Sequence, residues 1–126
     1  MTPYLLDLQL HREARGALIS LESAGAAALP FILQRVFFIF DVPAGQSRGE
    51  HVVPCRELIV ALRGSCAVTT VQHSVARDFD LSTPTRALYL PEGVWVRLHR
   101  FAPGTLVAVA ADRPYSPRPR ATESGV

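Results

Sequence analysis

The sequence predicts an all-β domain folded as a sandwich or barrel. Short segments rich in β-branched and aromatic residues recur along the chain, and Gly, Pro, Asp or Ser lies between them. The turn signals are spaced about 8 to 12 residues apart, which is typical of sandwiches and barrels and not of alternating strands and helices. No segment keeps a capped helical period for more than two turns. A chain of 126 residues is long enough for one domain with a real core.

Taken in order, the segments with the composition of strands cover most of the chain. They are ALISLES (17–23), QRVFFIFDV (34–42), RELIVALRGS (56–65), CAVTTVQHS (66–74), ARDFDLS (76–82), RALYLPEGVWVRLHRF (86–101) and TLVAVAAD (105–112). The alanine-rich AGAAALP stretch (24–30) is short and ends at a proline, so we expect a loop there. Residues 113–126 are polar and broken by prolines, so we expect a flexible tail after a folded domain of residues 1–112.

Two of these segments indicate how the strands are covered. In RVFFIFDV (35–42) apolar residues such as Phe37 and Phe38 occupy both faces, which predicts cover on both sides. The partner sheet would provide one cover, and a ligand pocket or a second subunit would provide the other. In VWVRLHRF (94–101) residues such as Val96 alternate with Trp95 and other less apolar side chains, so we expect a half-buried strand.

The composition bounds the partners and the compartment. A net charge of +2 is too small to indicate a nucleic-acid partner, and the chain has no lysine, so every basic residue is an arginine. That bias reflects either genome composition or arginines that grip phosphate or carboxylate with their planar fork. The chain lacks an apolar run of ~18 residues and a signal-peptide pattern, so we expect no membrane partner. Cys55 and Cys66 suit small buried hydrophobes in a reducing cytoplasm.

Residues at fixed spacing mark a candidate site. The chain carries His51, Val53, Glu57 and Gly64, and then Pro91-Glu92-Gly93 followed by Val96. These spacings resemble the two signature motifs of the cupin superfamily, which implies a jelly-roll β-sandwich. In metal-binding cupins the ligands are two histidines and a glutamate from the first motif and a histidine from the second. Val53 and Val96 stand at two of those places, and two protein ligands are too few for a typical site, so we expect no metal and no cofactor.

Further motifs narrow the resemblance to the sugar 3,4-ketoisomerase cupins. They are RxxRGxL (12–18), RVFFIFD (35–41), RGEH (48–51), LRGSC (62–66) and LYLPEGVW (88–95). That family acts on dTDP-4-keto-6-deoxyglucose without a metal and moves the ketone from C4 to C3 through an enediol. The resemblance implies binding of dTDP or a dTDP-linked sugar, and a homodimer that pairs through exchanged or shared strands. The chemistry needs a base that titrates near neutral pH, which histidine side chains provide, and donors for the enolate oxygen.

The resemblance assigns roles to individual residues. His51 would be the catalytic base, and Arg48 would stabilise a diphosphate or the enolate oxygen. The expected substrate and nucleotide contacts are Arg15, Arg35, Phe37, Val53, Leu58 and Trp95. The family's tyrosines fall at Phe37 and Phe38 and its second histidine at Val53. The phenolic donor and the second imidazole are therefore replaced, and Phe37, Val53 and Leu58 suit an apolar pocket floor.

Each of these residues also has a structural interpretation. His51 suits a hydrogen-bonded core histidine, Arg48 and Arg15 suit solvated turn residues, Trp95 suits a core aromatic, and Glu57 suits an ion pair with a nearby arginine. The histidines without a partner pattern, which we expect at the surface, are His11, His73 and His99.

Two classes of function follow. The first is a divergent dTDP-hexose 3,4-ketoisomerase, or a related nucleotide-sugar isomerase or epimerase, with His51 as its base. The second is a non-catalytic cupin that keeps the fold, and with it a nucleotide-sugar site, as a binding or assembly module. His51 and the family motifs favour the enzyme, whereas Phe37 and Val53 favour the module.

Overall fold

The computed structural model describes residues 1–24 and 29–116, and every regular element in these ranges is a strand. The strands are β1 (Tyr4–Asp7), β2 (Leu10–Glu13), β3 (Gly16–Ile19), β4 (Arg35–Phe40), β5 (Arg48–Val52), β6 (Glu57–Arg63), β7 (Cys66–Gln72), β8 (Val75–Leu81), β9 (Arg86–Leu90), β10 (Trp95–His99) and β11 (Leu106–Ala111). In these same ranges, no helix has the length and hydropathy needed to cross a bilayer.

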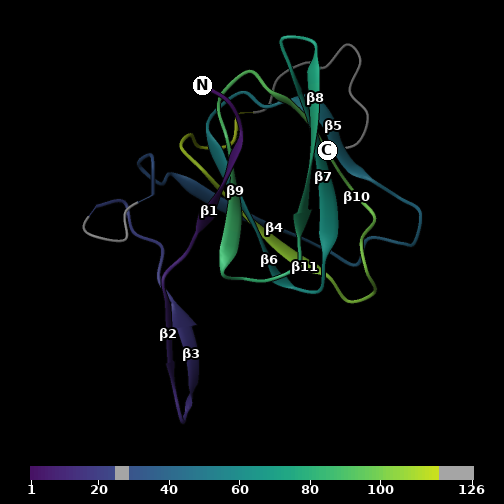
Figure 1. The fold of residues 1–126 in the computed structure, drawn as a ribbon. Coiled ribbons are helices and arrows are strands. Elements are labelled where there is room, and N and C mark those ends of the chain that lie inside the picture. The colour runs from purple at the N-terminus through teal and green to yellow at the C-terminus, as the bar shows by residue number, and fades with distance from the viewer. Residues whose placement is uncertain (25–28, 117–126) are drawn as a thin grey trace.

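The strands form two sheets that pack face to face as a sandwich (Figure 1). The large sheet has the order β1-β9-β6-β11-β4, and the small sheet has the order β5-β10-β7-β8. Strand β8 contacts β9, so the two sheets meet closely on that side. Strand β8 is one edge of the small sheet and lies near the β1–β9 edge of the large sheet. The other two edge strands, β4 of the large sheet and β5 of the small sheet, therefore both lie on the far side of the sandwich. The sandwich is therefore open between β4 and β5.

The main core lies between the sheets. Alternate residues of each central strand point inward, and they include Ile59, Leu88, Val96 and Val109, which are buried. The predicted alternation in the segment 94–101 is present, because Val96 and its apolar neighbours are buried while Trp95 is only half-buried. The sheets thus bury apolar rows against each other, which is the main stabilising contribution in such a fold.

A second apolar cluster covers the outer face of the large sheet. Leu58 and Tyr89 point away from the sandwich interior and pack against Leu29 and Phe31, which precede β4. Residues 25–28 lie outside the described residues, so only the ends of the expected loop at 24–30 are seen.

The sequence prediction missed or merged several elements. Strands β1, β2 and β5 lie outside the expected strand segments, and the expected strand of residues 86–101 is two strands separated by a turn at 91–94. This turn contains Pro91 and Gly93, whose φ of 94° is in the left-handed region. Of the predicted tail, residues 117–126 lie outside the described residues.

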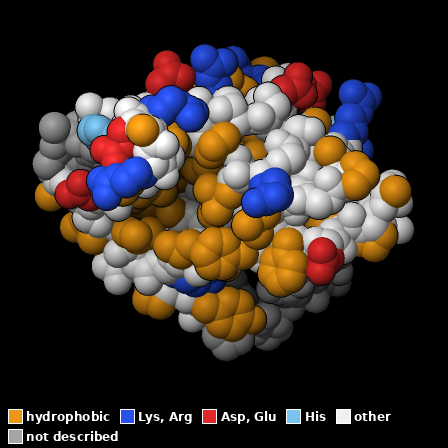
Figure 2. Space-filling view, turned by 90° about the horizontal axis from the view of Figure 1, so that it is seen from below, with side chains coloured by type: hydrophobic (Ala, Val, Ile, Leu, Met, Phe, Trp, Pro, Cys, Tyr) orange, Lys and Arg blue, Asp and Glu red, His pale blue; other side chains and the backbone are white. Residues whose placement is uncertain are grey.

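Two features extend beyond the sandwich. Strands β2 and β3 form a hairpin that projects from the body (Figure 1). The outer face of β4 exposes Val36, Phe38 and Phe40, with exposed fractions of 46%, 55% and 60%. Figure 2 shows hydrophobic side chains gathered around a hollow beside the projecting hairpin. The prediction that both faces of β4 are apolar is therefore confirmed, and within one chain its outer face is uncovered.

Candidate functional site

The candidate site lies at the open side of the sandwich, between the inner faces of β4 and β5. On β4, Arg35 and Phe37 point inward and are half-buried. On β5, His51 is paired with Val96, a residue of the inner core. Because directly paired residues of an antiparallel ladder share a face, the imidazole also points inward. The two edge strands thus bring a cation, an aromatic ring and an imidazole to one opening.

A β-bulge brings Arg48 to the same face as His51. The pairing of β5 with β10 shifts by one residue, so that Arg48 pairs with Leu98, Gly49 with Arg97, and His51 with Val96. Glu50 is the extra residue, with a φ of 62°. Without it, two residues three positions apart would point to opposite faces. The bulge therefore places the guanidinium of Arg48 at the rim of the opening that contains His51.

Two nitrogen atoms at the opening lack hydrogen-bond partners. The Nδ1 atom of His51 and the Nε atom of Arg35 are both buried and unpaired among the described residues. The guanidinium of Arg35 lies 4.8 Å from the centroid of the Phe37 ring and 5.7 Å from that of Tyr115. A buried nitrogen without a partner carries a free-energy penalty that a bound polar ligand removes.

The positions where cupins carry further histidines are part of the apolar core. Val53 is fully buried and Val96 is 2% exposed, and both contact the inner cluster. His51 and Val53 share a face, as the period of two predicts. In the described part of the chain, no group of three or more potential metal ligands lies together.

Glu57 is buried in the interior with an exposed fraction of 6%. Burial raises its pKa to about 7; the charge of Arg35 opposes this shift and that of Asp112 adds to it. In the ladder, Glu57 pairs with Ala111, which in turn pairs with Arg35, so the three side chains form one inner row. The expected ion pair of Glu57 is not formed, because no arginine nitrogen of the described residues is within 4 Å of it. Its carboxyl group instead faces the interior without a salt bridge.

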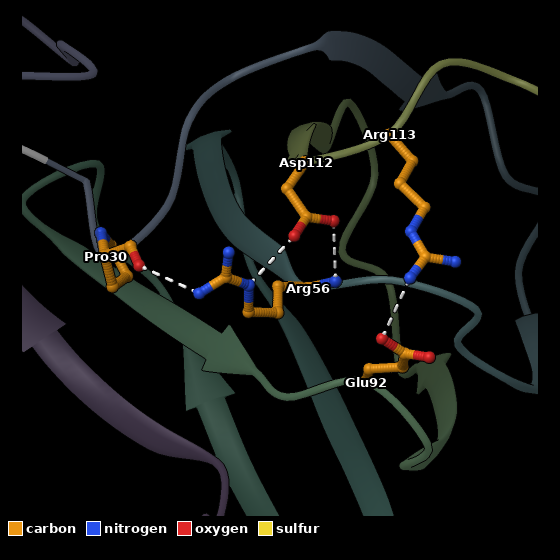
Figure 3. Close-up of polar contacts among 5 residues, drawn as sticks. All are labelled: Pro30, Arg56, Glu92, Asp112 and Arg113. Carbon is orange, nitrogen blue, oxygen red and sulfur yellow. Dashed lines mark hydrogen bonds and ion pairs between the residues drawn. The ribbon is translucent and has the colours of Figure 1, made fainter.

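The segment of residues 53–56, which links β5 to β6 and so joins the two sheets, is held by Asp112. The Asp112 carboxylate accepts hydrogen bonds from the backbone N–H of Arg56 at 3.0 Å and from its Nε at 2.8 Å (Figure 3). Arg56 also donates to the carbonyl oxygen of Pro30, and Arg113 donates to Glu92 on the other side of the segment. The two hydrogen bonds to Asp112 fix the short link between the strands of His51 and Glu57.

Three of the expected ligand contacts lie away from this opening in the single chain. Leu58 belongs to the cluster on the outer face of the large sheet, so its expected place on the pocket floor is not observed. Trp95 pairs with Val52 and points to the outer face of the small sheet. Arg15 lies at the turn of the projecting hairpin, where it forms an exposed ion pair with Glu13. One-residue alternation explains the first two placements.

A polar cluster on the outer face of the small sheet was not anticipated. The Thr69 hydroxyl donates to Asp78 at 2.6 Å and lies 2.8 Å from the Nε2 atom of His99. His99, expected at the surface, lies on this outer face and is half-buried, and its contact with Thr69 had no signal in the sequence. Burial, followed by the charges of Arg97 and Arg100, lowers its pKa. Only the strand pairing brings these residues together, so no local motif signals the cluster.

Comparisons with known proteins identify a family that matches the chain and several proteins that resemble it. The family model described as FdtA: WxcM-like, C-terminal matches residues 1–120. The TDP-4-oxo-6-deoxy-α-D-glucose-3,4-oxoisomerase of Aneurinibacillus thermoaerophilus is 30% identical over 104 residues, which cover 82% of this chain and 73% of that protein. The structure also resembles the TDP-quinovose 3,4-ketoisomerase WlaRB of Campylobacter jejuni, with 28% identity, a TM-score of 0.83, and coverage of 90% and 87% of the two chains.

The fold is shared more widely. A 3,4-ketoisomerase of Helicobacter canadensis superposes with a TM-score of 0.86 at 24% identity, over 92% of this chain and 86% of that one. A dTDP-4-dehydrorhamnose 3,5-epimerase of Bacillus anthracis superposes with a TM-score of 0.71 at 22% identity, over 90% and 74% of the chains. The predicted all-β jelly-roll sandwich is therefore confirmed.

Proposed function

The chain belongs to the FdtA family of WxcM-like C-terminal domains, and from that premise we propose that it is a dTDP-hexose 3,4-ketoisomerase. Its substrate would be a dTDP-linked 4-keto-6-deoxyhexose held between β4 and β5. The observation that carries this proposal is that the inner faces of β4 and β5 hold two buried nitrogens without a hydrogen-bond partner among the described residues, Nδ1 of His51 and Nε of Arg35. The relatives of Aneurinibacillus thermoaerophilus and Campylobacter jejuni reported above are TDP-sugar ketoisomerases, and a related ketoisomerase has been crystallised with TDP.

The residues at the opening suit the first half of the reaction. His51 removes the proton from C3, alpha to the C4 ketone, and the electrons move onto the ketone oxygen to give an enediol after protonation. Arg35 and Arg48 supply positive charge for the diphosphate or the developing oxyanion. Phe37 presents an apolar ring beneath the Arg35 guanidinium, which lowers the local dielectric and strengthens these charge interactions.

The second candidate, a non-catalytic module that binds a nucleotide sugar, is favoured by one observation. The buried Val53 and the half-buried Phe37 provide no group that transfers a proton at places where the resembling enzymes carry His and Tyr. Each missing acid or base typically lowers a rate by ~100- to 10,000-fold. Binding alone needs only the cavity and the arginines.

The test of the proposed function measures binding and proton exchange separately. Saturating dTDP, at 100 times its Kd, should stabilise the wild type by ~2.7 kcal/mol in thermal melts. His51→Ala should keep this shift but lose deuterium exchange at C3 of the dTDP-4-keto-6-deoxyhexose. The matched control is His73→Asn, because His73 is exposed and its φ of 52° is one that asparagine tolerates.

The outcomes separate the two candidates. An unchanged melting temperature at millimolar dTDP and dTDP-glucose would rule out both nucleotide-sugar functions. A wild type that binds dTDP but catalyses no exchange would favour the module over the isomerase.

We further propose that a second copy of the chain covers the outer face of β4. Edge strands with exposed apolar side chains tend to pair with another chain, and an isolated two-stranded hairpin is only marginally stable in water. Phe38 and Phe40 are exposed on this edge, and the β2–β3 hairpin projects beside it with Leu18 59% exposed. A partner hairpin placed here would also bring a second Arg15 toward the site, where the family resemblance assigns it a role.

Sedimentation at micromolar concentration tests the dimer. The wild type should sediment as a dimer, and Phe38→Glu should shift it to a monomer because a charge replaces an apolar contact. Val75→Glu, at a 51% exposed position on β8 at the other edge, should remain dimeric. A monomeric wild type, or a dimeric Phe38→Glu, would contradict the proposed interface.

A further inference from the structure

Glu57 is a buried carboxyl group that the first half of the reaction leaves unused. It begins β6 on the inner face of the large sheet, whereas His51 points inward from the small sheet. The two side chains therefore approach the interior from opposite walls. In the row Glu57–Ala111–Arg35, only a methyl group stands between the carboxyl group and the guanidinium. Two strand spacings separate their backbones, about 10 Å, so the carboxyl group and the guanidinium face the interior from the same wall.

The surroundings of Glu57 favour its neutral form near pH 7. The groups around it that carry charge or titrate are Arg35 on β4, Asp112 after β11 and Cys55, and the facing sheet contributes His51. The burial of the carboxylate outweighs the attraction of Arg35, so the pKa is raised to about 7. The side-chain carboxyl group of Glu57 forms no hydrogen bond within the ranges that the structure describes. A protonated carboxyl group without a partner has a hydrogen available to donate.

We propose that Glu57 is the catalytic acid of this site, donating a proton to the substrate oxygen from the wall opposite His51. The assignment rests on the proposed ketoisomerase function. In the first step His51 takes the proton from C3, while Glu57 gives its proton to the C4 oxygen, which yields the 3,4-enediol. In the second step the His51 imidazolium returns a proton to C4, and the Glu57 carboxylate takes the proton of the C3 hydroxyl as the C3 ketone forms. Both residues end in their starting states, and no other reactant is needed.

This role explains how the site works without a phenol at position 37. Phe37 lies on the same inner face as Glu57, two strands away, so a substrate over Phe37 would lie against the same sheet as Glu57. Pairs of titratable groups held in different environments are a common way to provide an acid and a base together near neutral pH. Here the base is half-buried at the opening and the acid is buried behind it.

The test compares Glu57→Gln with Glu92→Gln in the full-length chain. Glu57→Gln keeps the size of the side chain and should leave the dTDP-induced melting shift unchanged, while ketone transfer falls by ~100-fold or more. Glu92 is exposed and paired with Arg113 on the surface, so its variant should retain wild-type turnover. In the wild type, kcat should fall as the pH rises through about 7, because Glu57 must be protonated. Glu57→Gln should lack this alkaline decrease.

The outcomes distinguish the two proposals. If Glu57→Gln turns over at the wild-type rate with the same alkaline decrease, Glu57 is not the acid, although the isomerase function stands. If the wild type binds no dTDP and exchanges no proton, the proposed function fails and the role of Glu57 fails with it. Should Glu57→Gln fail to fold, the pH profile of the wild type still decides, because turnover that stays constant from pH 6 to 9 would overturn the assignment.

Discussion

Replacement of Gly49 by alanine should disturb the bulge that orients Arg48 and His51. Gly49 has a φ of 85°, a left-handed conformation that residues with a Cβ adopt only with strain. A Cβ at this position would lie 3.0 Å from the carbonyl oxygen of Val96 on β10. That oxygen is part of the sheet backbone, so it cannot rotate away as a flexible side chain would.

The expected cost has two parts. An L-residue in the left-handed region loses about 1–2 kcal/mol relative to glycine, and a tight contact against backbone adds roughly 1–2 kcal/mol. The chain contains a control for the first part, because Gly45 has a nearly equal φ of 81° but no atom within 4 Å of a built Cβ. Gly45→Ala should therefore lose only the stability that corresponds to the left-handed backbone conformation.

Urea unfolding of the wild type and both variants, at one protein concentration, measures the difference. Gly49→Ala should be less stable than Gly45→Ala by about 1–2 kcal/mol, or roughly 3–8 °C in Tm for a domain of this size. It should also lose C3 proton exchange more strongly than Gly45→Ala does, because the imidazole moves with the strand. Equal stability of the two variants would show that β5 can move away from β10 at no cost, which would refute the view of the bulge as a fixed element.

Three further predictions follow from the interior. Because burial raises the pKa of Glu57 from its ordinary value of 4.5 to about 7, the folded state holds this proton more tightly than the unfolded state. The free energy of unfolding should then fall as the pH rises from about 4.5 to 7, by on the order of 3 kcal/mol, and urea titrations of Glu57→Gln should lack this fall. Burial raises the pKa of both Cys55 and Cys66 to about 11, so an aromatic disulfide reagent should label the native thiols far more slowly than thiols in urea, and rapid native labelling would contradict their burial. In the Glu57→Gln background, Phe37→Tyr should raise ketone transfer by ~100-fold if the added hydroxyl acts as an ordinary general acid, whereas Phe38→Tyr, on the outer face, should change nothing.

The pattern of apolar residues was enough to predict the sandwich and the strand β4 with two apolar faces. Side chains of a strand alternate between its faces, so the residues on each face can be read from the sequence. The bulge was not predictable in this way, since Gly49 and Glu50 look like ordinary turn residues and only the pairing with β10 shows that Glu50 is extra. The same limit explains Leu58, whose face depends on the register of β6.

The positions of the candidate site residues were harder to predict than the strands, because they depend on contacts between distant segments. The motif spacing indicated His51, and the structure places it at the opening between the sheets. Glu57 looked like half of an ion pair, because the sequence alone does not show that Ala111 separates it from Arg35. The exposed Val36 and Phe38 were predicted to need cover, but this pattern does not identify the covering element, for which we propose a second copy of the chain.

The link between the sheets has a consequence for how this chemistry can be exchanged between proteins. Arg48, His51 and Glu57 all lie within one continuous segment that crosses from the small sheet to the large sheet, and Asp112 clamps that crossing through Arg56. Most of the polar groups at the opening thus lie in one short segment of the sequence. Strand β4 contributes Arg35 and the apolar ring of Phe37. Recombination that swaps this short segment would transfer Arg48, His51 and Glu57 as a unit, and the acceptor would need to supply the arginine and aromatic residue of β4 and an aspartate at the end of its last strand.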